Sequence, residues 1–350
     1  MHLHRFFKAH WKVLAVAAKV LFSLAALAVI WQRIAWPQLW DTLLRADPML
    51  VAIALFLLPL NLMLEALKWH IAVRRFDPQF TFQHAVESMM LGIAAGAATP
   101  FRAGDYAAKM IYLRSLSKWR TMGLVFFAGQ LLMLATTFFG LIALSVFFRL
   151  QSRTMLAAMS LIVLFIFFAL LFMLFKRLPQ FARFESSPQA WLRKLSRLHT
   201  LSNYTSRDWR GLLGTAAARY VVFTLQYTLL MLAASGAAAL SFWQAATAAS
   251  ATLFVKSLVP LFIGDLGIRE LTSAYFLSGF GAEAVVAVGA SLLIFVINTL
   301  LPAAIGLVYF FKLRLPSAAT RANENMQANE NMRADENMRA LAPQPPFRKR

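Results

Sequence analysis

Long apolar runs alternate with short basic segments along most of this chain. A transmembrane helix needs about 20 mainly apolar residues, and six runs are close to or above that length. They cover residues 13–30, 49–67, 122–148, 155–175, 212–238 and 285–311. We therefore expect an all-α polytopic membrane protein with about six full transmembrane helices.

Two further apolar segments, residues 89–109 and 243–276, are interrupted by proline, glycine and charged residues. Broken backbone at membrane depth is tolerated only inside protein or beside a watery cavity. If residues 89–109 crossed the bilayer, the basic residues that follow would lie outside, against the positive-inside rule. We therefore expect two re-entrant helical segments, one from each face. This arrangement is compatible with an inverted repeat, although the two halves share no visible sequence identity.

Charge supports this membrane assignment and indicates its orientation. The chain has 35 Lys and Arg against 15 Asp and Glu, a net charge of +20, and 60% of its residues are hydrophobic. The basic residues sit between apolar runs, so they indicate loops facing anionic lipid rather than nucleic acid. We expect membrane lipids as partners, a location in the inner (plasma) membrane, and both termini in the cytoplasm. The sequence leaves the oligomeric state open.

Composition also limits the available chemistry. Cysteine is absent and the six histidines are scattered, so we expect no metal site and no cofactor. No nucleotide-binding or hydrolase motif occurs, so we expect no enzyme activity and no nucleotide-driven pumping. Three six-residue repeats follow the apolar part. We expect a membrane domain over residues 1–315 and a disordered, low-complexity cytoplasmic tail over residues 316–350.

The first interrupted segment concentrates charge and backbone freedom within ten residues. It contains Pro100, Arg102, Gly104, Asp105 and Lys109. One interpretation is an anion-binding corner, in which Arg102 holds a phosphate through two parallel hydrogen bonds and Asp105 orients it. The other is an ordinary inner membrane boundary, where proline and glycine end a helix and arginine meets the headgroups.

The second interrupted segment has the same ingredients. Pro260, Gly264 and Gly267 can interrupt a helix. The charged residues of the segment are Lys256, Asp265, Arg269 and Glu270. A plain outer loop with solvated charges would explain most of them. Lys256 lies deep in the segment, where an unpaired charge costs about 2.5–3.5 kcal/mol. We therefore expect a salt bridge from Lys256 to Asp265 or Glu270.

Other polar residues in the apolar runs have simpler interpretations. We expect Arg219 to extend its side chain to the inner surface, and Glu65 to pair with a basic residue near the inner end of its helix. Gln130, Gln226 and Asn298 are expected to form hydrogen bonds between helices.

The two interrupted segments resemble one known family. The stretch from Pro100 to Asp105 is similar to its Pro-x-Arg-x-Gly-Glu motif, and the stretch from Pro260 to Glu270 is similar to its second motif, which ends in Gly-Val-Arg-Glu. The family is the flippase-like membrane region of lysylphosphatidylglycerol synthase, and the resemblance covers about residues 14–313. Asp105 replaces the usual Glu and Lys109 a common Arg, so the ligand can differ. The aminoacyl-transferase domain is absent from these 350 residues, so lysyl transfer is not implied.

The resemblance implies movement of a lipid between leaflets, with an anionic, glycosylated or polyprenyl lipid as the expected substrate. In this hypothesis Arg102, Asp105 and Lys109 receive the headgroup at the inner side. Asp265, Arg269 and Glu270 would receive it at the outer side, with Lys256 between the two sites. The alternatives are a membrane-embedded transferase acting on a lipid-linked substrate and a scaffold for envelope lipid synthesis.

Overall fold

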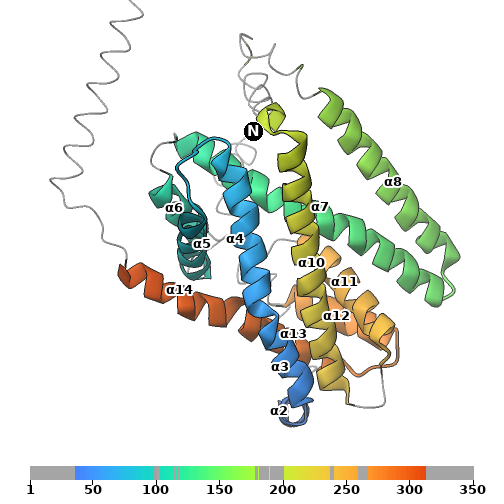
Figure 1. Cartoon of the computed structure of the whole chain (residues 1–350). Coiled ribbons are helices and arrows are strands. Elements are labelled where there is room, and N and C mark those ends of the chain that lie inside the picture. Colours follow the sequence, from blue (N-terminus) through green and yellow to red (C-terminus); the bar gives the residue numbers. More distant parts are fainter. Residues whose placement is uncertain are drawn as a thin grey trace, which may run out of the picture. The chain divides into compact units, whose positions relative to one another are not determined.

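The computed structural model describes residues 36–97, 103–113, 118–177, 201–236, 240–258 and 267–312, with Thr99, Leu116, Gln180 and Gln189. Every regular element in these residues is helical, as the apolar runs predict (Figure 1). The chain divides into two units, Met1–Leu307 and Val308–Arg350. Only the end of the last helix is described in the second unit. The predicted tail of residues 316–350 therefore lies outside the described residues.

The described part of the chain contains five segments that are long and apolar enough to cross a membrane: Pro48–Arg74, Arg120–Leu150, Thr154–Leu174, Ser206–Ser235 and Ala284–Tyr309. Each corresponds to one of the predicted runs, which confirms those five. The sixth run, residues 13–30, lies outside the described residues. The full number of spans and the re-entrant character of the interrupted segments stay predictions.

Proline and capping residues define the helices of these segments. The first segment consists of α3 (Pro48–Phe56) and α4 (Leu58–Arg74), which are separated at Leu57. Pro59 lacks an N–H and cannot continue the hydrogen-bond ladder, which explains the interruption. The next two segments are α7 (Lys118–Leu150) and α8 (Thr154–Arg177), which form an antiparallel pair.

The helix α10 (Ser206–Ser235) begins six residues before the predicted start at residue 212. A capping box explains the difference. Thr205 Oγ1 accepts from the N–H of Asp208, and the Asp208 carboxylate accepts from the N–H of Thr205. Hydrophobicity alone could not predict this start, because the first turn is polar.

The last segment changes helix type in its middle. It runs through α13 (Ala284–Phe295), the π-helix η4 (Val296–Leu300) and α14 (Leu301–Lys312). Pro302 lies four residues after Asn298 and cannot donate to its carbonyl, so the regular ladder is broken there. Such π-turns often occur at functional sites.

The two interrupted segments form helix pairs. The first consists of α5 (Phe82–Ala97) and α6 (Ala103–Tyr112), and the second of α11 (Phe242–Leu258) and α12 (Ile268–Ser278). In each case the two helices pack against one another. A short helix, α2 (Trp36–Leu44), precedes α3.

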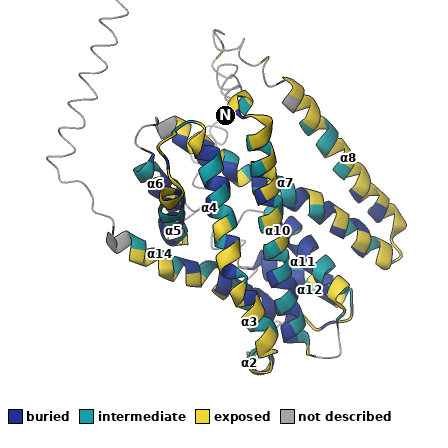
Figure 2. Ribbon diagram, viewed as in Figure 1, coloured by how far each residue is buried: buried dark blue, intermediate teal, exposed yellow. Residues whose placement is uncertain are grey.

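Burial separates the packed part of the bundle from its exposed helices. The largest core cluster brings together α10, α11, α12 and α13, and α10 also contacts α3, α4 and α7. In contrast, α8 packs on α7 and exposes most of its apolar side chains (Figure 2). Exposed apolar surface of this extent is expected of a helix that faces lipid.

Candidate functional site

A polar stripe runs along one face of α4. Asn61, Glu65 and Lys68 follow the i, i+4, i+7 spacing that places side chains on the same helix face. Asn61 and Lys68 are buried, and 16% of the Glu65 side chain is exposed. This stripe lies within an apolar segment, where charged residues are costly and typically mark a functional path.

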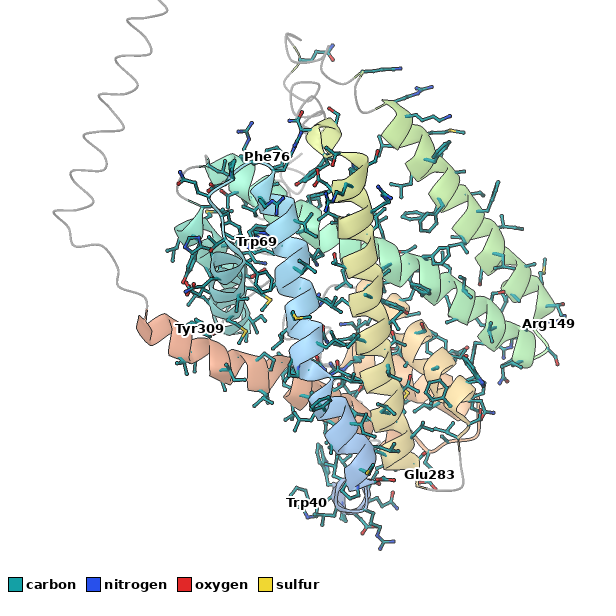
Figure 3. The ribbon with its side chains drawn as sticks, viewed as in Figure 1. Trp40, Trp69, Phe76, Arg149, Glu283 and Tyr309 are labelled. Atoms are coloured by element: carbon teal, nitrogen blue, oxygen red, sulfur yellow. The ribbon has the colours of Figure 1, made fainter. Side chains whose placement is uncertain are left out.

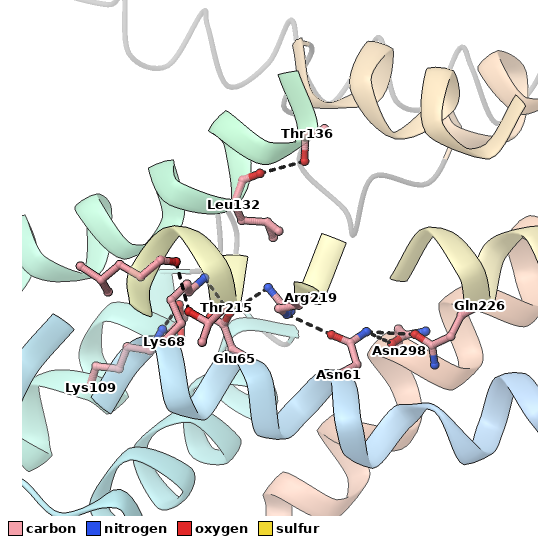
Figure 4. Close-up of polar contacts among 12 residues, drawn as sticks. Asn61, Glu65, Lys68, Lys109, Leu132, Thr136, Thr215, Arg219, Gln226 and Asn298 are labelled. Carbon is pink, nitrogen blue, oxygen red and sulfur yellow. Dashed lines mark hydrogen bonds and ion pairs between the residues drawn. The ribbon is translucent and has the colours of Figure 1, made fainter. Parts of the chain in front are cut away.

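Arg219 of α10 completes the stripe. Its Nη1 lies 2.8 Å from Glu65 Oε2, and its Nε donates to Asn61 Oδ1 at 3.0 Å. Lys68 Nζ lies 2.7 Å from the same Glu65 oxygen. Figure 4 shows these side chains in a row between α4 and α10. The expectation that Arg219 extends to the inner surface was therefore wrong, because a carboxylate on the neighbouring helix binds it inside the bundle.

The hairpin of α5 and α6 adds a second ion pair to this region. Lys109 Nζ lies 3.0 Å from Asp105 Oδ1 and 5.1 Å from the ring centre of Trp69, which follows Lys68 on α4. Two of the residues singled out from the sequence, Asp105 and Lys109, are thus brought to the α4 stripe.

Small residues allow the hairpin to close. A Cβ on Gly104 would collide with the Ala95 carbonyl, and one on Gly92 would collide with the Asp105 carboxylate. Thr99 links the two helices, because its hydroxyl donates to the Ala95 carbonyl and accepts from the N–H of Gly104, both at 2.8 Å. Gly104 is therefore required by close helix approach.

Three side-chain amides continue the stripe away from the charges. We call Asn61, Gln226 and Asn298 together the amide group. Asn61 Nδ2 donates to Gln226 Oε1 at 3.0 Å and to Asn298 Oδ1 at 2.8 Å. Gln226 Nε2 donates to the Ala54 carbonyl at 2.8 Å. Asn298 belongs to the π-helix η4. The prediction that Gln226 and Asn298 form hydrogen bonds between helices is confirmed, and their shared partner Asn61 joins α4, α10 and η4.

We use the name charge cluster for Glu65, Lys68, Asp105, Lys109 and Arg219. It holds three cations and two carboxylates, a net charge of +1. The lysine side chains are sealed, at 1% and 8% exposed, whereas those of Arg219 and Asp105 are 21% and 17% exposed. An anion could therefore reach Arg219 while the buried lysines supply positive potential at low dielectric.

The second interrupted segment has a different environment. Arg269 Nη2 lies 3.0 Å from Glu270 Oε1, and the Gly267 N–H donates to Glu270 Oε2 at 2.6 Å. Arg269 Nε also donates to Ser291 Oγ at 3.3 Å, and Tyr227 shares a 2.7 Å hydrogen bond with that hydroxyl. Both charged side chains are at most 4% exposed. We call this arrangement the buried pair.

Gly267 has φ +95°, a conformation that residues with a Cβ rarely adopt, and it begins α12. Glu270 binds Arg269 and the Gly267 N–H, whereas Asp265, the other expected partner of Lys256, lies outside the described residues. The remaining predicted site residues that lie outside the described residues are Pro100, Arg102, Pro260 and Gly264.

Sequence reasoning missed the polar stripe of α4. The available signal was the i, i+4, i+7 spacing of Asn61, Glu65 and Lys68, matched on α10 by Arg219 and Gln226, seven residues apart. Within the described residues no group of three or more His, Asp or Glu is placed to hold a metal ion.

The comparison with known families gives one match. The family described as "Lysylphosphatidylglycerol synthase TM region" matches residues 16–306, a range that includes the charge cluster, the amide group and the buried pair. The comparison with curated proteins finds no match. The chain therefore belongs to the lysylphosphatidylglycerol synthase transmembrane-region family and is an integral membrane protein related to lipid synthesis or translocation.

Proposed function

We propose that this protein moves a lipid headgroup between leaflets along the polar face shared by α4 and α10, without nucleotide hydrolysis. The observation that carries the proposal is the net positive charge cluster inside the bundle, in which Arg219 remains partly accessible. Charge at such a position is costly unless it serves a path for substrate or ions. The family's relation to lipid synthesis or translocation makes a lipid the expected substrate.

The charges indicate the substrate class. A net charge of +1 favours a singly charged anion such as a phosphodiester. The amide group beyond Arg219 offers hydrogen bonds that suit a sugar or phosphate without adding charge. We therefore propose an anionic, glycosylated or polyprenyl-linked lipid as the substrate, received first by Arg102, Asp105 and Lys109.

The buried pair must open before a headgroup can pass through the outer part of the path. Arg269 and Glu270 are buried and bind each other, so a headgroup can reach them only if this pair opens. In the proposed cycle the pair holds α12 against α13 through Arg269 and Ser291, and Lys256 and Asp265 also take part in receiving the headgroup.

The proposal is tested with purified protein in liposomes that carry fluorescent lipids in both leaflets. Addition of a membrane-impermeant reductant bleaches the outer leaflet, and translocation increases the bleached fraction beyond one half. We expect this increase for an anionic or glycosylated lipid and not in protein-free liposomes. Absence of translocation for every anionic, glycosylated and polyprenyl lipid tested would contradict the proposal and favour the transferase or scaffold alternative.

Orientation is part of the proposal. By the positive-inside rule, the basic segments that flank the spans should face the cytoplasm. Both termini should then lie in the cytoplasm as well. Reporter fusions at Thr200 and Arg321 should both give a cytoplasmic signal. An external signal at either position would contradict this topology.

A further inference from the structure

A basic cavity lies apart from the charge cluster, at the end of α4 and the beginning of α10. It has a volume of about 830 Å³ and is lined by residues of both helices and the turn after α4. This volume is within the range of about 300–1,000 Å³ that is typical of small-molecule sites. The charge cluster does not line it.

Four arginines converge on this cavity. Arg74 and Arg75 come from the end of α4, and Arg207 and Arg210 come from the first two turns of α10. Asp208 is the one carboxylate among the described residues that line it, so the lining carries a net charge of +3 with His70 neutral. The two groups of arginines are more than 130 positions apart in the sequence, so the fold, not local sequence, concentrates this charge.

The one carboxylate in the described lining, Asp208, is part of a helix cap. Asp208 accepts from the N–H of Thr205 at 2.9 Å and from its hydroxyl at 2.7 Å, as part of the cap of α10. The cap therefore holds the Asp208 carboxylate at the start of α10. The described lining of the cavity has four arginines and this one carboxylate.

Two of the arginines are anchored by backbone carbonyls. Arg75 Nε donates to the Asn203 carbonyl at 2.8 Å, and Arg210 Nε donates to the Ser206 carbonyl at 3.4 Å. Each bond uses one of the five N–H donors of the guanidinium, so donors remain for a ligand.

We propose that this cavity binds a phosphate-bearing anion with more than one negative charge. Guanidinium groups match phosphate oxygens in bidentate geometry, and a net charge of +3 favours two phosphate groups or one doubly charged phosphate. Basic pockets between helices on the cytoplasmic side are suited to anionic lipid headgroups. The same chemistry would accept a soluble phosphorylated molecule. This proposal does not depend on lipid translocation.

The full-length protein in detergent micelles is titrated separately with cardiolipin and with sodium pyrophosphate, while its melting temperature is measured. A ligand that binds the folded state raises this temperature. We compare the wild type with Arg74→Gln/Arg207→Gln. The matched control is Arg149→Gln/Arg153→Gln, which also removes two exposed arginines, but at the α7–α8 turn, where Figure 3 shows Arg149 far from Phe76 at the end of α4.

The proposal predicts that the concentration for half of the maximal shift rises about tenfold or more in Arg74→Gln/Arg207→Gln and stays unchanged in the control. An effect with cardiolipin alone identifies a lipid site, and an effect with pyrophosphate identifies a site for soluble phosphates. Equal effects in both double variants, or no shift with either ligand, would overturn the proposal. If the glutamine variant is recovered poorly, Arg74→Lys/Arg207→Lys replaces it, because lysine keeps the charge but cannot bind phosphate in bidentate geometry. If that variant binds the ligand as tightly as the wild type, the bidentate site is overturned.

Discussion

The charge cluster and the buried pair are built from the same kinds of residue but differ in how completely their charges are satisfied. In the buried pair, one arginine binds one carboxylate, and the side chains are at most 4% exposed. In the charge cluster, three cations share two carboxylates, and Arg219 is 21% exposed. A balanced and sealed pair is suited to holding helices together, whereas an unbalanced and accessible cluster is suited to receiving an anion.

The largest expected effect concerns the stability of the buried pair. Glu270→Gln leaves Arg269 without its countercharge at a site that excludes water, which should cost about 3–5 kcal/mol of unfolding free energy. Asp105→Asn in the charge cluster should cost about 1 kcal/mol, because 17% of the Asp105 side chain is exposed and solvent screens its pair with Lys109. Melting temperatures of the two variants in detergent test this difference. Equal losses would contradict the distinction between the two regions.

A second prediction concerns the hairpin that brings Asp105 and Lys109 to α4. Gly104→Ala places a methyl group against the Ala95 carbonyl and should destabilise the protein by about 1–3 kcal/mol. Gly129→Ala in α7 is the control, because a Cβ there meets nothing within 4 Å. In a helix interior that change should stabilise by about 0.5–1 kcal/mol. Melting temperatures that shift in the same direction for both would count against the close packing of α5 on α6.

A third prediction tests whether Arg102 binds a ligand, in contrast to Arg269, which binds the carboxylate of Glu270. If Arg102 grips a phosphate in a bidentate fork, Arg102→Lys should lower transport about tenfold at matched membrane abundance. Arg314→Lys, which lies after the last apolar run in the sequence, should transport normally. Near-normal transport by both variants would make Arg102 an ordinary boundary residue.

Apolar runs predicted the five described spans, because bilayer thickness sets their length. They did not predict where α10 begins, because the Thr205–Asp208 cap lies in polar sequence. Within the candidate site, the sequence singled out Asp105 and Lys109, which form an ion pair on α6. It could not pair Glu65 with Arg219, since these residues are 154 positions apart and only the packing of α4 on α10 makes them neighbours.

The central claim is that the excess positive charge of the charge cluster governs lipid movement, and Arg219→Gln tests it most directly. This change leaves the Glu65–Lys68 and Asp105–Lys109 pairs intact, so the cluster becomes neutral without an isolated charge. The measurement is the translocation rate of an anionic fluorescent lipid in liposomes, with Arg149→Gln as a control that removes one exposed arginine. We predict a loss of about tenfold or more in Arg219→Gln and wild-type rates in the control. Wild-type rates in both variants would contradict the account.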